Sequence, residues 1–299
     1  MADHDQTSDA AGIDVNTRAA VLVEALPYIQ EFAGRTVVVK FGGNAMVDPA
    51  LSHQFAADIV LLRAVGLKPV VVHGGGPQIG ELLAQLGKES EFRDGLRVTD
   101  AETLDVARMV LTGRVGADIV GAINAHGRVA VGLSGLDAGL ITAEQRDERL
   151  GYVGDVVDVQ RQILDTLIEA GFVPVISTIG SDTSGQAYNI NADTAAIAIA
   201  EALGAEKLVY LTDVPGVLTD VGDPSSLISR LSASRARLLI DDGVINGGMI
   251  PKVGACLDAL EAGVGSAHIL DGRVPHVLLL ELLTDAGVGT MLTRTDEGS

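Results

Sequence analysis

The chain has 299 residues, of which 47% are apolar, and it carries 40 acidic against 21 basic side chains, for a formal net charge of −19. This length supports a sizeable core in one large domain or two lobes, and the acidic excess excludes non-specific binding to nucleic acid or to anionic membranes. The single cysteine, Cys256, excludes an internal disulfide and a cysteine-based zinc site, and it is typical of a reducing cytoplasm.

Residues 1–15 are polar and lack the basic region and apolar core of a secretory signal, so we expect a polar tail. No run of about 18 apolar residues occurs in the chain, so no membrane-spanning helix is predicted. Residues 16–33 have the apolar spacing of an amphipathic helix.

Short apolar runs then alternate with helical patterns along the rest of the chain. The predicted strands cover 36–40, 69–72, 129–133, 172–177, 207–211 and 267–270, and the predicted helices cover 49–65, 77–86, 101–125, 159–170, 192–203, 232–241 and 249–262. Strands that are apolar on both faces and separated by helices form a parallel sheet covered on two sides, which predicts an α/β fold. The short, Gly-rich stretch 139–157 instead indicates a β-hairpin on the rim.

Three loops at the expected carboxyl ends of strands carry consecutive glycines. They are "KFGGN" (Lys40–Asn44), "HGGGPQIG" (His73–Gly80) and "INGGMIPKV" (Ile245–Val253). Ligands of open parallel sheets bind at this edge, and exposed N–H groups at such turns, with a helix start beyond, form anion sites. One Gly pair is more often an ordinary turn, but three in one sheet favour an anionic ligand. No P-loop and no G-x-G-x-x-G motif occurs.

Two lysines in these loops occupy unfavourable positions. Lys40 ends a buried strand, and Lys252 lies in the first turn of a predicted helix, where a cation opposes the macrodipole at a cost of about 0.3–1 kcal/mol. A bound polyanion at this helix end would make the position of the lysine favourable. In "YNINAD", Asn189, Asn191 and Asp193 are spaced by two, so the asparagines face one side if the chain is extended. One helix cap would explain only one of the three.

Arg97 is the charged residue of "FRDGLRVTDAE" without a local role. Asp94 and Gly95 predict a turn, and Thr99 with Glu102 matches a capping box for the next helix. A guanidinium fork suits a carboxylate. Arg97 is therefore a candidate for binding an acidic ligand, with a surface position as the alternative.

Six segments taken in order resemble acetylglutamate kinases, of the amino-acid kinase family, over about residues 17–295. They are "VVVKFGGNAM", "VVHGGGPQI", "NINADTAA", "LTDVPGVL", "GGMIPKV" and "SAHILDGRVPHVLLLELLTDAGVGT". The resemblance implies an open αβα sandwich, with an acetylglutamate-binding lobe over 35–206 and a nucleotide-binding lobe over 207–299. It implies a cytoplasmic enzyme of arginine biosynthesis that phosphorylates the side-chain carboxylate of N-acetyl-L-glutamate with ATP and Mg²⁺.

The resemblance also implies roles for single residues. Lys40 and Lys252 match the lysines that stabilise the phosphoryl group in transit, and Asp193 matches the aspartate that holds both ammonium groups. The implied acetylglutamate contacts are Gly74, Gly75, Arg97, Asn189 and Asn191. The implied nucleotide contacts are Gly42, Gly43, Asp213, Gly216, Leu218, Val244, Ile245, Asn246 and Met249. No residue is assigned as a metal ligand. The loop 132–141, "GLSGLDAGLI", departs from the Gly-Lys-Asp-Gly pattern of many members, which leaves its substrate contacts open.

Arginine-inhibited members carry an extra N-terminal helix that interlaces dimers into a hexameric ring, and residues 16–34 resemble that helix. Tyr28 matches the sensing tyrosine, and the arginine site is matched by His268, Glu281 and Gly287. The resemblance thus implies a homo-oligomer, a dimer or a hexamer, with L-arginine as inhibitor. The alternative for 16–34 is a helix that only covers a sheet edge.

Two alternative functions stay open at the level of sequence. One is a related kinase acting on carbamate, aspartate or an aminoadipate derivative, against which Arg97 and the "NINAD" spacing favour acetylglutamate. The other is a non-catalytic arginine sensor, against which the retained Lys40, Lys252 and Asp193 argue.

Overall fold

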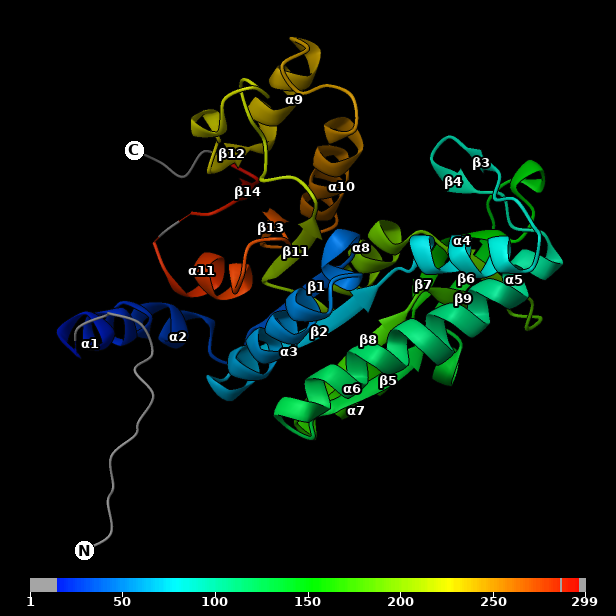
Figure 1. Ribbon diagram of the computed structural model, residues 1–299, viewed down its shortest axis with the longest axis horizontal. Coiled ribbons are helices and arrows are strands. Elements are labelled where there is room, and N and C mark those ends of the chain that lie inside the picture. The colour runs from blue at the N-terminus through cyan, green and yellow to red at the C-terminus, as the bar shows by residue number, and fades with distance from the viewer. Residues whose placement is uncertain (1–14, 286, 296–299) are drawn as a thin grey trace, which may run out of the picture.

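The computed structural model describes residues 15–285 and 287–295, so most of the predicted polar tail lies outside the described residues. Its largest element is an eight-stranded sheet with the order β12-β14-β13-β11-β1-β2-β8-β5 (Figure 1). The strands are β1 (Thr36–Phe41), β2 (Lys68–His73), β5 (Ala130–Ser134), β8 (Val173–Ser177), β11 (Lys207–Thr212), β12 (Arg230–Ser232), β13 (Ser266–Asp271) and β14 (Thr290–Thr293). The run from β13 to β5 is parallel, and β14 is antiparallel to β13, so the predicted mainly parallel sheet is confirmed.

Helices cover both faces of this sheet, as the apolar strands require. Along β1, Val37 and Val39 pack into one core and Val38 into the other. The first core is closed by α2 (Leu26–Phe32), α3 (Pro49–Ala64), α4 (Gly76–Gln85), α11 (Val277–Leu283) and the continuous run α5 (Ala101–Arg108), η2 (Met109–Gly116) and α6 (Ala117–His126). The second is closed by α7 (Gln162–Glu169), α8 (Ala192–Leu203), α9 (Ala233–Asp241) and α10 (Met249–Glu261). Each fully buried branched side chain contributes about 1.5–3 kcal/mol to this packing.

The N-terminal helix is broken rather than continuous. The prediction of one helix over 16–33 is wrong, because the chain forms α1 (Val15–Glu24) and α2 with a turn at Ala25 between them. Pro27 lies in the first turn of α2, where its fixed φ is favourable, but inside one long helix its ring would clash with the preceding turn. Both helices lie at one end of the molecule, where α2 contacts α11 (Figure 1).

The predicted rim hairpin is confirmed and forms part of a small barrel. Its strands β6 (Ile141–Gln145) and β7 (Val153–Val159) are antiparallel. They close with β9 (Ile179–Ser181) and β10 (Ala187–Ile190) into a four-stranded barrel. Because β10 leads directly into α8, the barrel fixes the extended "NIN" segment against the helix start.

The approach to α5 differs from the predicted capping box. The predicted turn at Asp94 and Gly95 is confirmed, with φ of 50° and 78°, in the β3–β4 hairpin (Phe92–Arg93 and Leu96–Arg97). The N-cap of α5 is Asp100 rather than Thr99, and its Oδ1 accepts the Thr103 amide at 2.8 Å. The helix begins one residue later than the motif suggests, which frees Thr99 for buried contacts near Asn189.

The sequence patterns did not predict α11, β12 or β14. The sheet is continuous across residues 206 and 207, because β11 pairs directly with β1. The division into two lobes at that point stays a prediction. Among the described residues, no helix combines the length and the apolar character needed to cross a membrane.

Candidate active site

The two glycine loops that follow β1 and β2 meet at one edge of the sheet. These strands are parallel neighbours, so their carboxyl ends bring Gly42–Gly43 beside Gly74–Gly75. The loops line a cleft of about 670 Å³. The same cleft is lined by Lys40, Arg97, Asn189 and Asn191, so the structure brings together every residue predicted to contact acetylglutamate. By contrast, none of residues 132–141 is among the residues that line it.

The start of α4 lies on this cleft as a ready anion site. Gly75 precedes the helix and supplies no side-chain cap to its first turn. Unpaired N–H groups and the positive end of the helix dipole favour a bound anion at such a position.

Lys40 lines the cleft, where an ion pair fixes its ammonium group and a glycine leaves space for it. Its Nζ lies 3.0 Å from Oδ1 of Asp193, in the first turn of α8, and its side chain is 17% exposed. A Cβ at Gly42 would lie 2.7 Å from this Nζ, so a residue with a side chain would displace the ammonium group. Asn191 is the N-cap of α8, accepting the amides of Asp193 and Thr194 at 2.8 and 3.2 Å. Asn191 therefore caps the helix, and it also lines the cleft.

A second cavity, of about 290 Å³, adjoins the first through Lys40 and Gly43. Lys252 and Asp193 also line it, so the two lysines and the aspartate converge on one space from β1, α10 and α8. Nζ of Lys252 donates to the Gly248 carbonyl at 3.3 Å within its own helix. No ion pair holds Lys252 among the described residues, which leaves its ammonium group able to turn toward an arriving anion.

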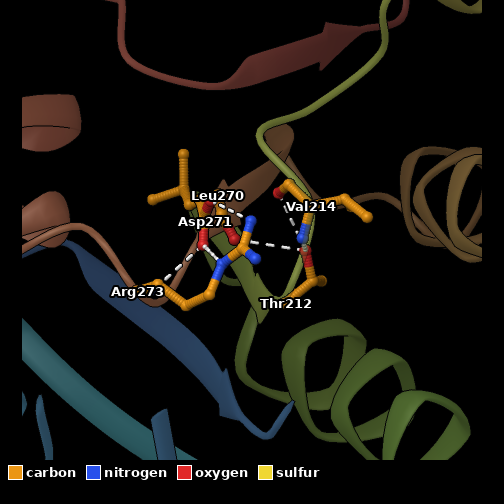
Figure 2. Close-up of polar contacts among 5 residues, drawn as sticks. All are labelled: Thr212, Val214, Leu270, Asp271 and Arg273. Atoms are coloured by element: carbon orange, nitrogen blue, oxygen red, sulfur yellow. Dashed lines mark hydrogen bonds and ion pairs between the residues drawn. The ribbon is translucent and has the colours of Figure 1, made fainter. Parts of the chain in front are cut away.

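The loop after β11 carries Asp213 into this second cavity. Figure 2 shows how the loop is anchored: Oγ1 of Thr212 donates to the Leu270 carbonyl at 3.3 Å and accepts the Val214 amide at 3.3 Å. Beside it, Arg273 forms two side-chain hydrogen bonds to Asp271, at 2.8 and 2.7 Å. The Thr212–Leu270 bond ties the end of β11 to β13, and the other bonds hold the loops that follow these two strands.

Most of the predicted nucleotide contacts lie away from this lining. Of the nine, Gly43 and Asp213 line the second cavity, and Gly42 lines the first cleft only. The other six line neither of the two: Gly216, Leu218, Val244, Ile245, Asn246 and Met249. Ile245 is buried in the core, and Gly216 has φ 137° with Oγ1 of Thr290 only 2.6 Å from where its Cβ would be. Both positions have a packing role in the structure. Nucleotide binding by these six residues stays a prediction.

Arg97 is a buried cation on the cleft without a carboxylate. It is 9% exposed, its Nη2 donates to the Gly76 carbonyl at 2.8 Å, and its guanidinium lies 4.7 Å from the centroid of the Phe92 ring. Nη1 donates to Oγ of Ser90. Burial lowers the pKa of Arg97. No acidic side chain forms an ion pair with it within the described ranges, and a buried unpaired charge is costly, so the site fits an anionic ligand.

Asn189 is fixed at the cleft by Thr99. Its Nδ2 donates to Oγ1 of Thr99 at 3.2 Å, and that hydroxyl donates to the Arg97 carbonyl at 2.8 Å. The predicted pair Arg97 and Asn189 is thus linked through a buried threonine that sequence reasoning assigned to a cap. The feature of the sequence that could have indicated this link is the position of Thr99, two residues after Arg97.

A third cavity, of about 360 Å³, lies near α2 and is lined by all four residues predicted for arginine, Tyr28, His268, Glu281 and Gly287. Nδ1 of His268 lies 2.8 Å from Oε1 of Glu281, and burial lowers the pKa of His268. The other oxygen of Glu281, Oε2, is buried and has no hydrogen-bond partner among the described residues. The phenol of Tyr28 donates to Asp285, which also lines the cavity and was missed from sequence.

Comparisons with known proteins give the family of this chain. The model of the amino acid kinase family matches residues 35–271. An acetylglutamate kinase of Nostoc sp. is 58% identical over 92% of this chain and 93% of its own length, and one of Thermosynechococcus vestitus is 57% identical over 93% and 95%.

Solved structures extend the likeness. An N-acetylglutamate synthase from Neisseria gonorrhoeae, complexed with coenzyme A and N-acetyl-glutamate, is 28% identical with a TM-score of 0.81, covering 93% of this chain and 64% of the synthase. A carbamate kinase from Giardia lamblia bound to AMP-PNP has a TM-score of 0.64 at 20% identity, covering 88% of this chain and all of that chain, and shows the shared fold alone.

Proposed function

Since this chain belongs to the amino acid kinase family, and within it to the acetylglutamate kinases, we infer that it is an enzyme that transfers the terminal phosphoryl group of ATP to the side-chain carboxylate of N-acetyl-L-glutamate, in arginine biosynthesis. The observation that carries this inference is the joint placement of Arg97, Lys40 and Lys252. One buried cation without a carboxylate lines the substrate cleft, and two ammonium groups line the adjoining cavity. The single cysteine, Cys256, is buried and in no disulfide among the described residues, which is compatible with a cytoplasmic location.

The chemistry requires charge compensation rather than a base. The acceptor carboxylate is already ionised near about pH 7, so it can attack without losing a proton. Its approach to the ATP phosphates is opposed by like charge, by about 4 kcal/mol for each unit pair at about 4 Å and an effective dielectric near 20. The ammonium groups of Lys40 and Lys252 and the N–H donors of the two glycine loops offset a repulsion of this size. Catalysis then consists of positioning and preorganised electrostatics.

Each residue has a distinct part in this proposal. Arg97, with Asn189 beside it, binds the acidic substrate in the cleft, and the Gly74–Gly75 loop presents amides to the acceptor carboxylate. Lys40 lies where the two cavities join, and we propose that the phosphoryl group passes at this point. Asp193 holds the Lys40 ammonium group in place. Lys252 approaches the same phosphoryl group from α10.

Magnesium is the metal that fits this donor set. Proteins commonly hold Mg²⁺ through one or two carboxylates together with substrate phosphates, and the second cavity contains the carboxylates of Asp193 and Asp213. When bound with ATP, Mg²⁺ supplies positive charge to the phosphate oxygens.

A coupled assay of ADP release with a panel of acceptors tests the function directly. Acetylglutamate should support turnover, and carbamate, aspartate and aminoadipate derivatives should not. Turnover with carbamate alone would exclude the proposed substrate, and binding of arginine without any turnover would favour the sensor.

We also propose that L-arginine binds the third cavity and inhibits the enzyme. The cavity combines Glu31, Glu281 and Asp285, whose carboxylates suit a guanidinium and an amino group. Oε2 of Glu281 has no hydrogen-bond partner in the described part of the chain, so it can accept a hydrogen bond from arginine. A synthase from Neisseria gonorrhoeae solved with coenzyme A and L-arginine is 27% identical to this chain, with a TM-score of 0.76 and coverage of 93% of this chain and 65% of the synthase.

Replacing Glu281 by glutamine should raise the arginine concentration for half-inhibition about 10- to 100-fold, because a hydrogen bond to a charged group contributes about 1.5–3 kcal/mol. Turnover without arginine should be unchanged, since glutamine retains the acceptor for His268. The matched control is Glu261→Gln, at an exposed carboxylate paired with Arg237. Equal arginine inhibition in wild type, control and Glu281→Gln would refute this site.

The exposed apolar surface of α1 supports a homo-oligomer. Val21, Leu22 and Val23 are 52%, 75% and 68% exposed on a helix at the end of the molecule. We propose that α1 pairs with α1 of a second copy and links dimers into a hexamer. Light scattering should then show that the Leu22→Asp variant forms an assembly of smaller mass than the wild-type protein. An Asn16→Asp control adds the same charge to the same helix. An unchanged mass for Leu22→Asp would argue against this contact.

A further inference from the structure

His73 is a buried titratable residue that the reaction does not use directly. It is the last residue of β2, immediately before the Gly74–Gly75 loop, and it has no solvent exposure. Burial lowers its pKa to about 4, so the imidazole is neutral under ordinary conditions. Its Nδ1 lies 2.9 Å from the Gly74 carbonyl oxygen. A carbonyl only accepts, so Nδ1 carries the proton and donates.

This hydrogen bond fixes the direction of a peptide plane that borders the cleft. The Gly74 carbonyl and the Gly75 N–H belong to one trans peptide and therefore point in opposite directions. With the carbonyl directed at the buried imidazole, the Gly75 N–H is directed away from it. Gly75 lines the cleft, and its N–H donates to no backbone carbonyl among the described residues. Without His73, the flexible glycine peptide could rotate, because glycine has few conformational restraints.

A π-helical segment closes the other side of His73. The segment η2, Met109–Gly116, interrupts the long helix from α5 to α6, and π-helical turns occur frequently at functional sites. Nε2 of His73 faces Gly116, where a Cβ would lie only 3.2 Å away, and it has no hydrogen-bond partner within the described part of the chain. Leu111 of the same segment packs against Gly75: a Cβ at Gly75 would lie 2.6 Å from Cδ2 of Leu111.

We propose that His73, supported from behind by the π-helical segment at Leu111 and Gly116, is a positioning residue that orients the Gly75 N–H toward the acceptor carboxylate. The assignment of the acceptor as the carboxylate of acetylglutamate rests on the proposed function. The orientation of the peptide by His73 does not depend on it.

Two matched pairs of variants test this role. Asparagine at position 73 keeps a donor at the place of Nδ1, whereas glutamine carries its amide at the place of Nε2 and loses the bond to Gly74. A Cβ at Gly116 would lie 3.0 Å from the Leu111 carbonyl oxygen and 3.2 Å from Nε2 of His73, so alanine there strains the segment that supports the imidazole and presses on the imidazole itself. Alanine at Gly113, in the same segment, meets no atom within 4 Å. Each pair therefore makes similar chemical changes, and only one member disturbs the Gly74 peptide.

His73→Gln and Gly116→Ala should raise the KM for acetylglutamate about 10- to 100-fold, as expected for a misplaced binding group. The KM for ATP should change less, and His73→Asn and Gly113→Ala should resemble wild type. Hydrogen exchange in a peptide covering Gly74–Gly80 should accelerate in the first two variants only, whatever substrate is present. Equal exchange and equal KM within both pairs would overturn the proposal. Absence of turnover in wild type, with the expected exchange pattern, would instead refute only the assigned substrate.

Discussion

Replacing Lys40 by alanine should lower kcat roughly 10²-fold or more, in line with the loss of one preorganised donor to developing charge. The ammonium group lies where the substrate cleft and the second cavity join, 3.0 Å from Asp193. Removing it takes positive charge from the path of the phosphoryl group. It also leaves the negative charge of Asp193 uncompensated beside two anionic substrates, and this repulsion lowers kcat further. Lys252→Ala should have an effect of the same kind, because Lys252 lines the same cavity.

Single-turnover measurements at saturating ATP and acetylglutamate separate this effect from weaker binding. Lys68→Ala is the control, because Lys68 is exposed at the opposite end of β2 from the glycine loop. Thermal unfolding should be similar in the control and the active-site variants. If either Lys40→Ala or Lys252→Ala turned over at the rate of the control, its assigned role in phosphoryl transfer would be wrong.

Replacing Arg97 by alanine should raise the KM for acetylglutamate by a factor of about 30 to 5 × 10³, because losing one partner of a buried charge pair costs about 2–5 kcal/mol. The guanidinium is oriented by the Gly76 carbonyl, by Ser90 and by the Phe92 ring. Lysine at position 97 should recover only part of the affinity, since it keeps the charge and loses the planar fork.

Steady-state kinetics with acetylglutamate varied at saturating ATP would measure this effect. Arg93→Ala provides the comparison, because Arg93 lies in the same hairpin and pairs with Glu91 at the surface. The KM for ATP should stay near the wild-type value in both variants. An acetylglutamate KM that is the same in Arg97→Ala and Arg93→Ala would mean that another group binds the substrate.

The long elements of the fold followed from periodicity alone. Strands such as β1 and β2 are apolar on both faces because helices cover both, and α8 was predicted with its observed bounds, Ala192–Leu203. The missed elements are short. β12 and β14 have three and four residues, and α11 has seven, so none spans enough turns or alternations to show a period. The break at Ala25 was missed because the apolar spacing continues across Pro27.

By itself, the sequence determined which residues bring charge and backbone donors to the ends of strands: Lys40, Lys252, the glycine loops and the "NINAD" segment. Only the tertiary structure decided that these segments meet. The parallel order of β11, β1 and β2 brings loops from distant parts of the chain to one edge, and the barrel sets Asn189 and Asp193 against that edge. Contacts of this kind depend on sheet order and helix packing, which no local pattern encodes. For the same reason, the link of Thr99 to Asn189 and the contact of His73 with the π-helical segment could be found only in three dimensions.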